Sequence, residues 1–337
     1  MTVFAFSREH PARIWTARLV VLAALAAYPL IVNEYPRTLV TEIFIYGIFA
    51  MSLDLLFGFT GLMSFGHAAF FGLGAYTTVI LGVQFGISAW LGILAGILAA
   101  SFGALAVGFF CTQTSGVTFL MLTLAFSQLF FSAAVKWRDV TGGSDGISLG
   151  EKPTLFGISL YDPFAMYYTV LCCFVLSYVV LHRIVASPLG HVFIGIRENE
   201  PRMRAIGFRT RVFKVLSFSI GGAFAGLAGG IYAIYNDFIS PDALYWTSSG
   251  DILIVVILGG AGTLVGPVIG TAVFLLMKNL VSSHSEHWML IIGVIFISCV
   301  MFFPRGIWGT LARLWPRRQA PAPGSTAVRS AIGRGRF

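Results

Sequence analysis

Apolar stretches of about twenty residues follow one another along most of this chain, and this pattern limits the fold more than any other feature. A helix needs about twenty apolar residues to cross the hydrocarbon core of a bilayer. Such stretches cover roughly residues 18–33, 38–57, 64–83, 87–110, 116–135, 163–182, 213–235 and 288–303. With 57% hydrophobic and 11% charged residues, the chain holds more apolar side chains than a soluble domain of 337 residues could bury. The pattern predicts an all-α integral membrane protein.

The distribution of basic residues predicts how the chain is oriented in its membrane. Short loops that are rich in Lys and Arg stay on the cytoplasmic side. Seven basic residues lie between 183 and 214, and seven more lie between 305 and 337. We therefore expect a cytoplasmic N-terminus at 1–17, a transmembrane domain at 18–304 with a cytoplasmic loop at 183–212 and external loops at 136–162 and 236–250, and a basic, disordered cytoplasmic tail at 305–337. This placement explains the net charge of +8 without a nucleic-acid partner.

Glycines interrupt the apolar pattern in both halves of the chain. The stretch from Asp251 to Leu280 is broken by GGAGTLVGP at 259–267, and a similar glycine-rich break occurs at 58–76. If 251–280 crossed the membrane only once, the basic tail would lie outside, so we expect a broken, re-entrant pair of short helices there. Irregular backbone at membrane depth is tolerated only where protein or a water-filled cavity covers it. The prediction is a polytopic bundle of about 8–10 transmembrane segments with broken helices and a weak internal repeat.

Paired glycine-interrupted segments in two halves of a membrane protein indicate the translocation pathway of a transporter. The candidate pathway residues are the small polar groups and glycines of the two breaks: Thr60, Ser64, Gly66, His67, Gly259, Gly262 and Thr263. A second interpretation is that these glycines simply allow helices to pack closely. The two interpretations are compatible.

Ionisable residues within the spans are functional candidates, because each costs roughly 2.5–3.5 kcal/mol at the bilayer centre. Glu42, Asp251 and Lys278 lie close enough to span ends to reach the interface. Asp54 and His67 lie deeper and need a partner in the protein. They could form a proton relay, or they could hydrogen-bond backbone groups that the glycine break frees. We favour the second role, because one acid and one histidine make a poor relay.

The sequence holds no pattern that indicates catalysis or nucleotide binding. GxxxxGK[ST], HExxH and CxxC motifs are absent, so no P-loop or zinc-protease site is expected. We expect no catalytic residue, no metal and no cofactor in this chain. A membrane-embedded enzyme is therefore the weakest of the possible functions.

The basic loop has a pattern of its own. Pro188 and Gly190 separate it from the preceding span, Pro201 lies near the start of its second portion, and Gly207 is a helix stop. Its apolar residues could form a strip that lies on anionic lipid. The same strip could instead dock into a groove on a cytoplasmic partner.

Six stretches together resemble the LivM-type permease subunits of ABC importers for branched-chain amino acids. They are AMSLDLLFGFTGLMSFGHAAFFGLGAY (50–76), VTFLMLTLAFSQLFF (117–131), TGGSDGI (141–147), SPLGHVFIGIRENEPRMRAIGF (187–208), FSIGGAFAGLAGGIYA (218–233) and ILGGAGTLVGPVIGT (257–271). The resemblance covers about residues 40–305. It implies that the segment around 200–207 is similar to the EAA-like loop that docks on the ATPase, although Glu-Pro-Arg replaces the EAA letters. The implied coupling residues are Arg197, Glu198, Glu200, Arg202, Arg204 and Gly207.

The resemblance also implies a heteromeric importer in a bacterial inner (plasma) membrane. A second, LivH-type permease would pair with this multi-pass chain, and two cytoplasmic ATPase subunits would bind the ATP. A periplasmic binding protein would deliver leucine, isoleucine or valine, and both chain termini would be cytoplasmic. Related permeases take urea, short amides or carboxylates, and the stretch from residue 50 is similar to urea permeases. The alternatives are therefore one of those substrates or, in a different class, an ion-coupled secondary transporter.

Overall fold

The computed structural model describes residues 23–150, 154–155, 158–160, 162–284, 287–302 and 306–314. The expected cytoplasmic N-terminus at 1–17 and residues 315–337 of the expected tail lie outside the described residues. Within the described part of the chain, 7 helices are long and apolar enough to cross a membrane. The fold is the all-α, polytopic bundle that the apolar pattern predicts.

The helices follow the apolar stretches of the sequence closely. Residues 23–31 are helical. The longer helices after them are α2 (Glu34–Asp54), α3 (His67–Phe85), α4 (Ala89–Cys111), α5 (Gly116–Lys136), α7 (Pro163–Ala186), α8 (Pro188–Ala205), α9 (Thr210–Asn236), α10 (Trp246–Gly259), α11 (Val265–Ser282), α12 (Trp288–Phe302) and α13 (Gly306–Leu314). The short elements are α6 (Arg138–Thr141), β1 (Ile147–Ser148), β2 (Thr154–Leu155), β3 (Ile158–Ser159), β4 (Phe238–Ile239) and 3-10 turns at Gly143–Asp145 and Pro241–Leu244.

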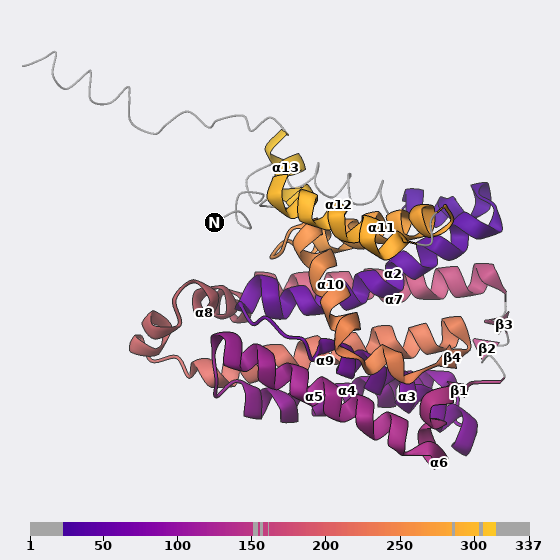
Figure 1. Cartoon of the computed structure of the whole chain (residues 1–337), viewed down its shortest axis with the longest axis horizontal. Coiled ribbons are helices and arrows are strands. Elements are labelled where there is room, and N and C mark those ends of the chain that lie inside the picture. The colour runs from indigo at the N-terminus through magenta and orange to yellow at the C-terminus, as the bar shows by residue number, and fades with distance from the viewer. Residues whose placement is uncertain are drawn as a thin grey trace, which may run out of the picture.

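The polar connections gather at two opposite ends of the bundle. In Figure 1, α8 projects from one end, whereas β1, β2, β3 and β4 lie at the other. β1 pairs antiparallel with β4, so that Ile147 lies opposite Ile239. β2 and β3 form a separate antiparallel pair. The two connections that we expect to be external, 136–162 and 236–250, are therefore joined at the end away from α8, which we call the strand end.

Helices α3, α4 and α9 pack closely because glycines face one another across their contacts. A Cβ atom added to Gly74 of α3 would overlap the backbone of Gly226 in α9. One added to Gly229 would overlap the carbonyl group of Phe71 in α3. Small residues let helix backbones approach in lipid, where dispersion replaces the hydrophobic effect as the driving force. Gly74, which lies in the first glycine-rich stretch, therefore serves close helix packing.

The C-terminal part of the described chain differs from the sequence expectation at one boundary. Residues 306–314, which we placed in a disordered tail, form helix α13 and pack against α10 and α11. Close contact explains this order, because a Cβ atom on Gly306 would lie about 2.5 Å from the backbone of Gly260. The structured part of the chain thus extends at least to Leu314.

Candidate functional site

The first glycine break follows a change in helix type. Helix α2 continues beyond Asp54 as a π-helical turn, Leu55–Thr60, and π-helical turns within helices are frequent at functional sites. The Thr60 hydroxyl donates to the carbonyl oxygen of Leu55 at 3.0 Å, which satisfies an acceptor inside this turn. Gly61 then adopts a φ of 79° and ends the helix. The chain re-enters a helix only at His67.

The second break, between α10 and α11, holds an unusual backbone. Gly262 adopts a φ of 78°, which suits glycine. Leu264 adopts a φ of 55°, a conformation that costs a non-glycine residue free energy. The Thr263 hydroxyl donates to the Gly260 carbonyl at 2.8 Å and accepts from the Gly266 amide at 2.9 Å. The break is a folded loop with its own hydrogen bonds.

Asp54 connects the two breaks. Its carboxylate accepts hydrogen bonds from the amide of Gly262 at 2.6 Å and from the amide of Leu264 at 3.1 Å. Asp54 is fully buried, and a Cβ atom on Gly58 would overlap its carboxylate. The expected role, to hydrogen-bond freed backbone, holds for Asp54; His67 contacts the Ser52 hydroxyl instead. The freed backbone, however, belongs to the second break and not to the one that follows Asp54 in sequence.

Helix α8 reaches the same place through Arg197. Its guanidinium group donates a hydrogen bond to the carbonyl oxygen of Gly58. Its aliphatic stem lies against Gly61, where an added Cβ atom would be 3.1 Å away. Arg197 is also within electrostatic reach of Asp54. We call these contacts of Asp54, Gly58, Arg197, Gly262 and Leu264 the Asp54 junction; they join both breaks to a helix outside the spans.

Helix α8 consists of two parts with a kink at Asn199. The Asn199 side chain accepts a hydrogen bond from the amide of Arg202 at 2.9 Å, so it caps the second part. That part ends at Ala205, and Gly207 follows two residues later with a φ of 96°. The amide of Phe208 donates to the carbonyl of Met203 at 3.1 Å, and the amide of Gly207 donates to that of Arg204 at 3.0 Å. These bonds form a Schellman motif, as the glycine stop at 207 predicts.

Glu200 anchors the second part of α8 to the start of α9. Its carboxylate accepts from Lys214 at 2.5 Å, from Arg204 at 2.6 Å and from Thr210 at 3.0 Å. The Lys214 side chain is only 6% exposed. Burial on its own would raise the pKa of Glu200. The hydrogen bonds from Lys214 and Arg204 outweigh burial and hold the pKa below its ordinary value of 4.5.

This anchor gives a pH-dependent prediction. Replacing Glu200 with glutamine is expected to destabilise the chain by about 2 kcal/mol at pH 7. Hydrogen bonds to charged groups contribute roughly 1.5–3 kcal/mol each to the free energy of unfolding, and they contribute less where one partner is exposed. A carboxyl whose pKa falls on folding stabilises the protein above its unfolded pKa, and this contribution is lost as the pH falls. The gap in melting temperature between wild type and Glu200→Gln should therefore narrow below about pH 4.5. A gap that stays constant down to pH 3.5 would contradict the assignment.

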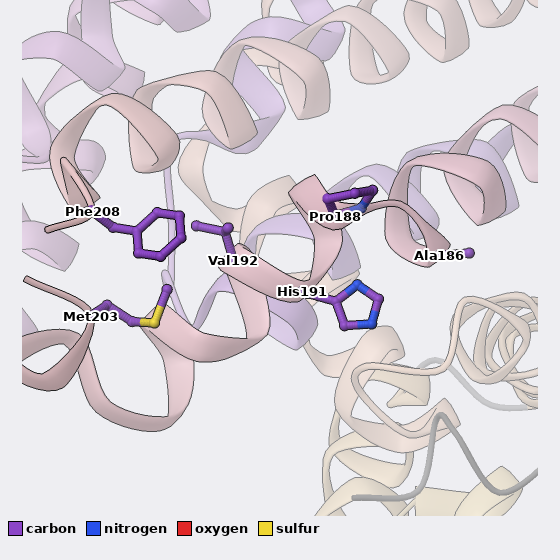
Figure 2. A pocket seen from close by; sticks show the side chains of 6 residues that line it. All are labelled: Ala186, Pro188, His191, Val192, Met203 and Phe208. Atoms are coloured by element: carbon purple, nitrogen blue, oxygen red, sulfur yellow. The ribbon is translucent and has the colours of Figure 1, made fainter. Parts of the chain in front are cut away.

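The outer face of α8 carries an apolar hollow of about 610 Å³, lined by Ala186, Pro188, His191, Val192, Met203 and Phe208. Figure 2 shows Met203 and Phe208 pointing toward Val192 from the other side of the kink. Apart from Ala186 at the end of α7, its lining residues lie outside the candidate spans. The apolar lining makes this hollow a candidate contact surface for another molecule.

The other predicted pathway residues are packed into the bundle. His67 lies 2.8 Å from the Ser52 hydroxyl through Nε2 and stacks on Phe49, with ring centroids 5.5 Å apart. The Ser64 hydroxyl accepts from the Gly66 amide at 3.2 Å, and a Cβ atom on Gly66 would approach the Thr123 carbonyl to 2.6 Å. Of the predicted coupling residues, only Glu200 is partly buried, and the other five are exposed. None of the predicted pathway residues lines the hollow on α8. None lines a second hollow, between α2, α10 and α11, that is described below.

Sequence reasoning missed three residues of this region. Lys214 was counted among the charges of the basic loop, but it is buried in α9 and binds Glu200. The sequence does not show that Asn199 caps a helix, because the kink in α8 is not predictable from it. Nor does it show the unusual backbone of Leu264, which has the pattern of any other apolar residue. Of these three, only Lys214 could have been recognised from the sequence, because it lies four residues after the start of an apolar span and follows the acidic Glu200.

The fold and this region together define a class of protein. Glycine-interrupted helices that meet at their breaks, with a charged helix outside the candidate spans in contact with them, are features of multi-pass membrane transport proteins. Comparisons with known proteins make the class specific. Residues 35–300 match the family model described as branched-chain amino acid transport system / permease component. The chain belongs to this family of ABC transporter permeases.

Several relatives are known by name. The chain is 30% identical over 319 residues to the high-affinity branched-chain amino acid transport system permease protein LivM of Escherichia coli (strain K12), covering 88% of this chain and 74% of the relative. It is 25% identical to a probable LivM of Methanocaldococcus jannaschii, over 75% of this chain and 83% of the relative. It is 27% identical to the guanosine ABC transporter permease protein NupQ of Bacillus subtilis (strain 168), over 57% and 63%. No solved structure matches the chain.

Proposed function

We propose that this chain is the LivM-type membrane subunit of an ATP-driven importer for leucine, isoleucine and valine. The similarity to LivM over most of both chains supports these substrates. The guanosine permease shows that relatives of this chain serve other substrates as well. On this proposal a LivH-type permease completes the pathway, two ATPase subunits hydrolyse ATP, and a periplasmic binding protein delivers the substrate.

The Asp54 junction is the observation that carries the proposal. A helix that docks on an ATPase can drive transport only if its movement reaches the spans. Helix α8 meets this requirement twice, since Arg197 contacts the first break and Glu200 is bound to Lys214 of α9. The apolar hollow of α8, with exposed Glu198 and Arg202 nearby, is the surface that we assign to the ATPase.

The mechanism follows from these contacts. ATP binding closes the two ATPases and moves α8 as a rigid unit. Arg197 passes this movement to the first break, and the Asp54 carboxylate passes it on to α10 and α11 through its two backbone bonds. The helices on either side of the breaks then shift as rigid bodies, which exposes the pathway to alternate sides. Asp54 acts here as a connecting group and not as a proton carrier.

The proposal fixes the orientation of the chain. Helix α8 and both termini are cytoplasmic in the bacterial inner membrane, and the strand end faces the periplasm (Figure 1). The positive-inside rule supports this choice. Helix α8 and the loop that joins it to α9 carry four arginines, and three more basic residues, Arg183 of α7 and Arg211 and Lys214 of α9, lie beside them.

Uptake measurements test the substrate. Cells that lack this chain are expected to lose saturable uptake of labelled leucine, and uptake in wild-type cells should be blocked by isoleucine and valine but not by urea. Leucine uptake that is unchanged by the deletion would sink the amino-acid proposal. The permease family would still stand, and the substrate would be sought among urea, amides and carboxylates.

A second experiment tests the coupling helix. Replacing Glu200, Arg204 and Gly207 together with alanine is expected to abolish both co-purification of the ATPase and transport, because the second part of α8 loses its anchor and its glycine stop. The variant should still insert in the membrane. The matched control is Lys136→Ala, an exposed basic residue at the end of α5 near the strand end. Retained ATPase association in the triple variant would rule out the coupling assignment.

A further inference from the structure

A second hollow, of about 360 Å³, lies between spans near the strand end. It is lined by residues of α2, α3, α9, α10 and α11, together with β4 and the turn after it. Pockets for small ligands typically enclose roughly 300–1,000 Å³ and combine an apolar wall with a few polar groups. This hollow has the size and the mixed character of such a site, and it lies away from the Asp54 junction.

One wall of the hollow is aromatic. Phe49 and Phe71 are almost fully buried, with ring centroids 4.7 Å apart. Tyr232 lies 5.3 Å from Phe71 and 5.8 Å from Tyr46, and Phe274 completes the wall from α11. His67 stacks behind Phe49. Phe49, Phe71 and His67 therefore hold the wall in place from behind, and the partly exposed rings of Tyr46, Tyr232 and Phe274 offer apolar surface to a ligand.

The mouth of the hollow carries charges of both signs. Asp251 of α10 and Lys278 of α11 both line it, and each is exposed on the chain surface. Lys278 lies within electrostatic reach of Asp251 and of Glu42 on α2. Charged side chains on spans are costly toward lipid, so they face a protein interior or a watery path. Their shared position marks the side of the chain that faces the pathway.

We propose that this hollow is a transient binding site for an amino-acid zwitterion with an apolar side chain, a proposal that rests on the proposed function. Asp251 receives the α-ammonium group, Lys278 receives the α-carboxylate, and the aromatic wall takes the aliphatic side chain. A neutral amide such as urea could use neither charge fully and would leave the wall uncovered. The chemistry thus favours amino acids over urea.

The sequence assigned both substrate contact and movement to the glycine breaks, and this proposal places the two roles in different regions. The glycine breaks form the mechanical junction at the α8 end. The charged substrate contacts come from two side chains that sequence reasoning had placed at the interface, Asp251 and Lys278, with Glu42 nearby. They share a face because α2 packs against α11 and α11 packs against α10.

Cysteine labelling tests the site without depending on transport. In the assembled importer, with the four native cysteines replaced, Ser248→Cys places a thiol in the hollow and Ser144→Cys places one outside it. Millimolar leucine is expected to slow labelling of Ser248→Cys at least threefold and to leave Ser144→Cys unchanged. Adding Asp251→Asn or Lys278→Gln should remove this protection. Equal protection by urea, or none by leucine, would overturn the proposal.

Two further outcomes are distinguishable. If Ser248→Cys is inaccessible in the importer with or without leucine, the second permease covers the hollow and the proposal is overturned. The kinetics of leucine uptake give an independent measure. Lys278→Gln should raise the KM for leucine at least tenfold while the variant still binds the ATPase. An unchanged KM would overturn the proposed site. If the wild-type importer itself fails to take up leucine, the proposed function fails, whatever the variants do.

Discussion

Replacing Asp54 with alanine is expected to reduce uptake to less than a tenth of the wild-type rate while the chain still inserts and binds its ATPase. The change removes two charge-assisted hydrogen bonds, worth roughly 1.5–3 kcal/mol each, and leaves the amides of Gly262 and Leu264 unpaired and buried. The strained backbone of Leu264 then loses the only side-chain acceptor that its amide has among the described residues. Uptake in proteoliposomes, measured beside ATP hydrolysis, should show hydrolysis that no longer drives transport.

The variant Asp54→Asn separates this role from a proton relay. Asparagine keeps one acceptor oxygen and can hold one of the two amides, so its uptake should fall between those of wild type and Asp54→Ala. A relay needs a group that gains and loses a proton, and asparagine would abolish it as fully as alanine does. Ion-driven uptake by the purified chain without ATPase, lost in Asp54→Asn, would contradict the connecting role and favour a secondary carrier.

The membrane-spanning helices could be predicted because lipid leaves the backbone few choices. A buried amide in hydrocarbon must be paired, so a run of apolar residues becomes a helix and a cluster of glycines becomes a break. Both breaks fall within the predicted glycine-rich stretches, although the first is shorter than predicted, because residues 67–76 belong to α3. Their meeting was not predictable, because Asp54 and Gly262 lie 208 residues apart and neither segment carries a pattern that names the other as its partner.

The same limit explains the incomplete prediction at α8. Proline and glycine signals mark where its parts begin and end, since these residues act on the local backbone. The direction of each charge depends on the kink at Asn199, which lets Arg197 face the breaks while Glu200 faces α9. Composition treats both as members of one basic loop. Only the packed structure separates an anchor from a surface charge such as Arg202.

The junction and the second hollow divide the work of the chain between its two ends. At the α8 end, backbone groups and a buried carboxylate form contacts that transmit movement. Toward the strand end, rings and opposite charges form a surface that suits a ligand. The two regions are joined by α2, which carries Asp54 at one end and Tyr46 and Phe49 within its length. A shift of α2 at the junction would therefore also change the aromatic wall.

The contact between α3 and α9 should be highly sensitive to added volume. A methyl group at Gly229 would overlap the carbonyl oxygen of Phe71, and both groups belong to helix backbones that cannot move aside. Overpacking a core typically costs 1–3 kcal/mol where side chains can adjust; with backbone on both sides we expect Gly229→Ala to cost about 3 kcal/mol or more. The detergent-solubilised chain should show a markedly lower melting temperature and reduced yield.

Gly293→Ala is the matched control, because Gly293 lies in α12 with nothing within 4 Å of an added Cβ atom. Alanine favours the helix over glycine by about 1 kcal/mol, so this variant should melt at the wild-type temperature or slightly above it.

Phe71 also lines the second hollow, so any Gly229→Ala protein that does fold should take up leucine with a raised KM. If the two alanine variants melt at the same temperature, the close approach of α3 and α9 is not what holds this part of the bundle together.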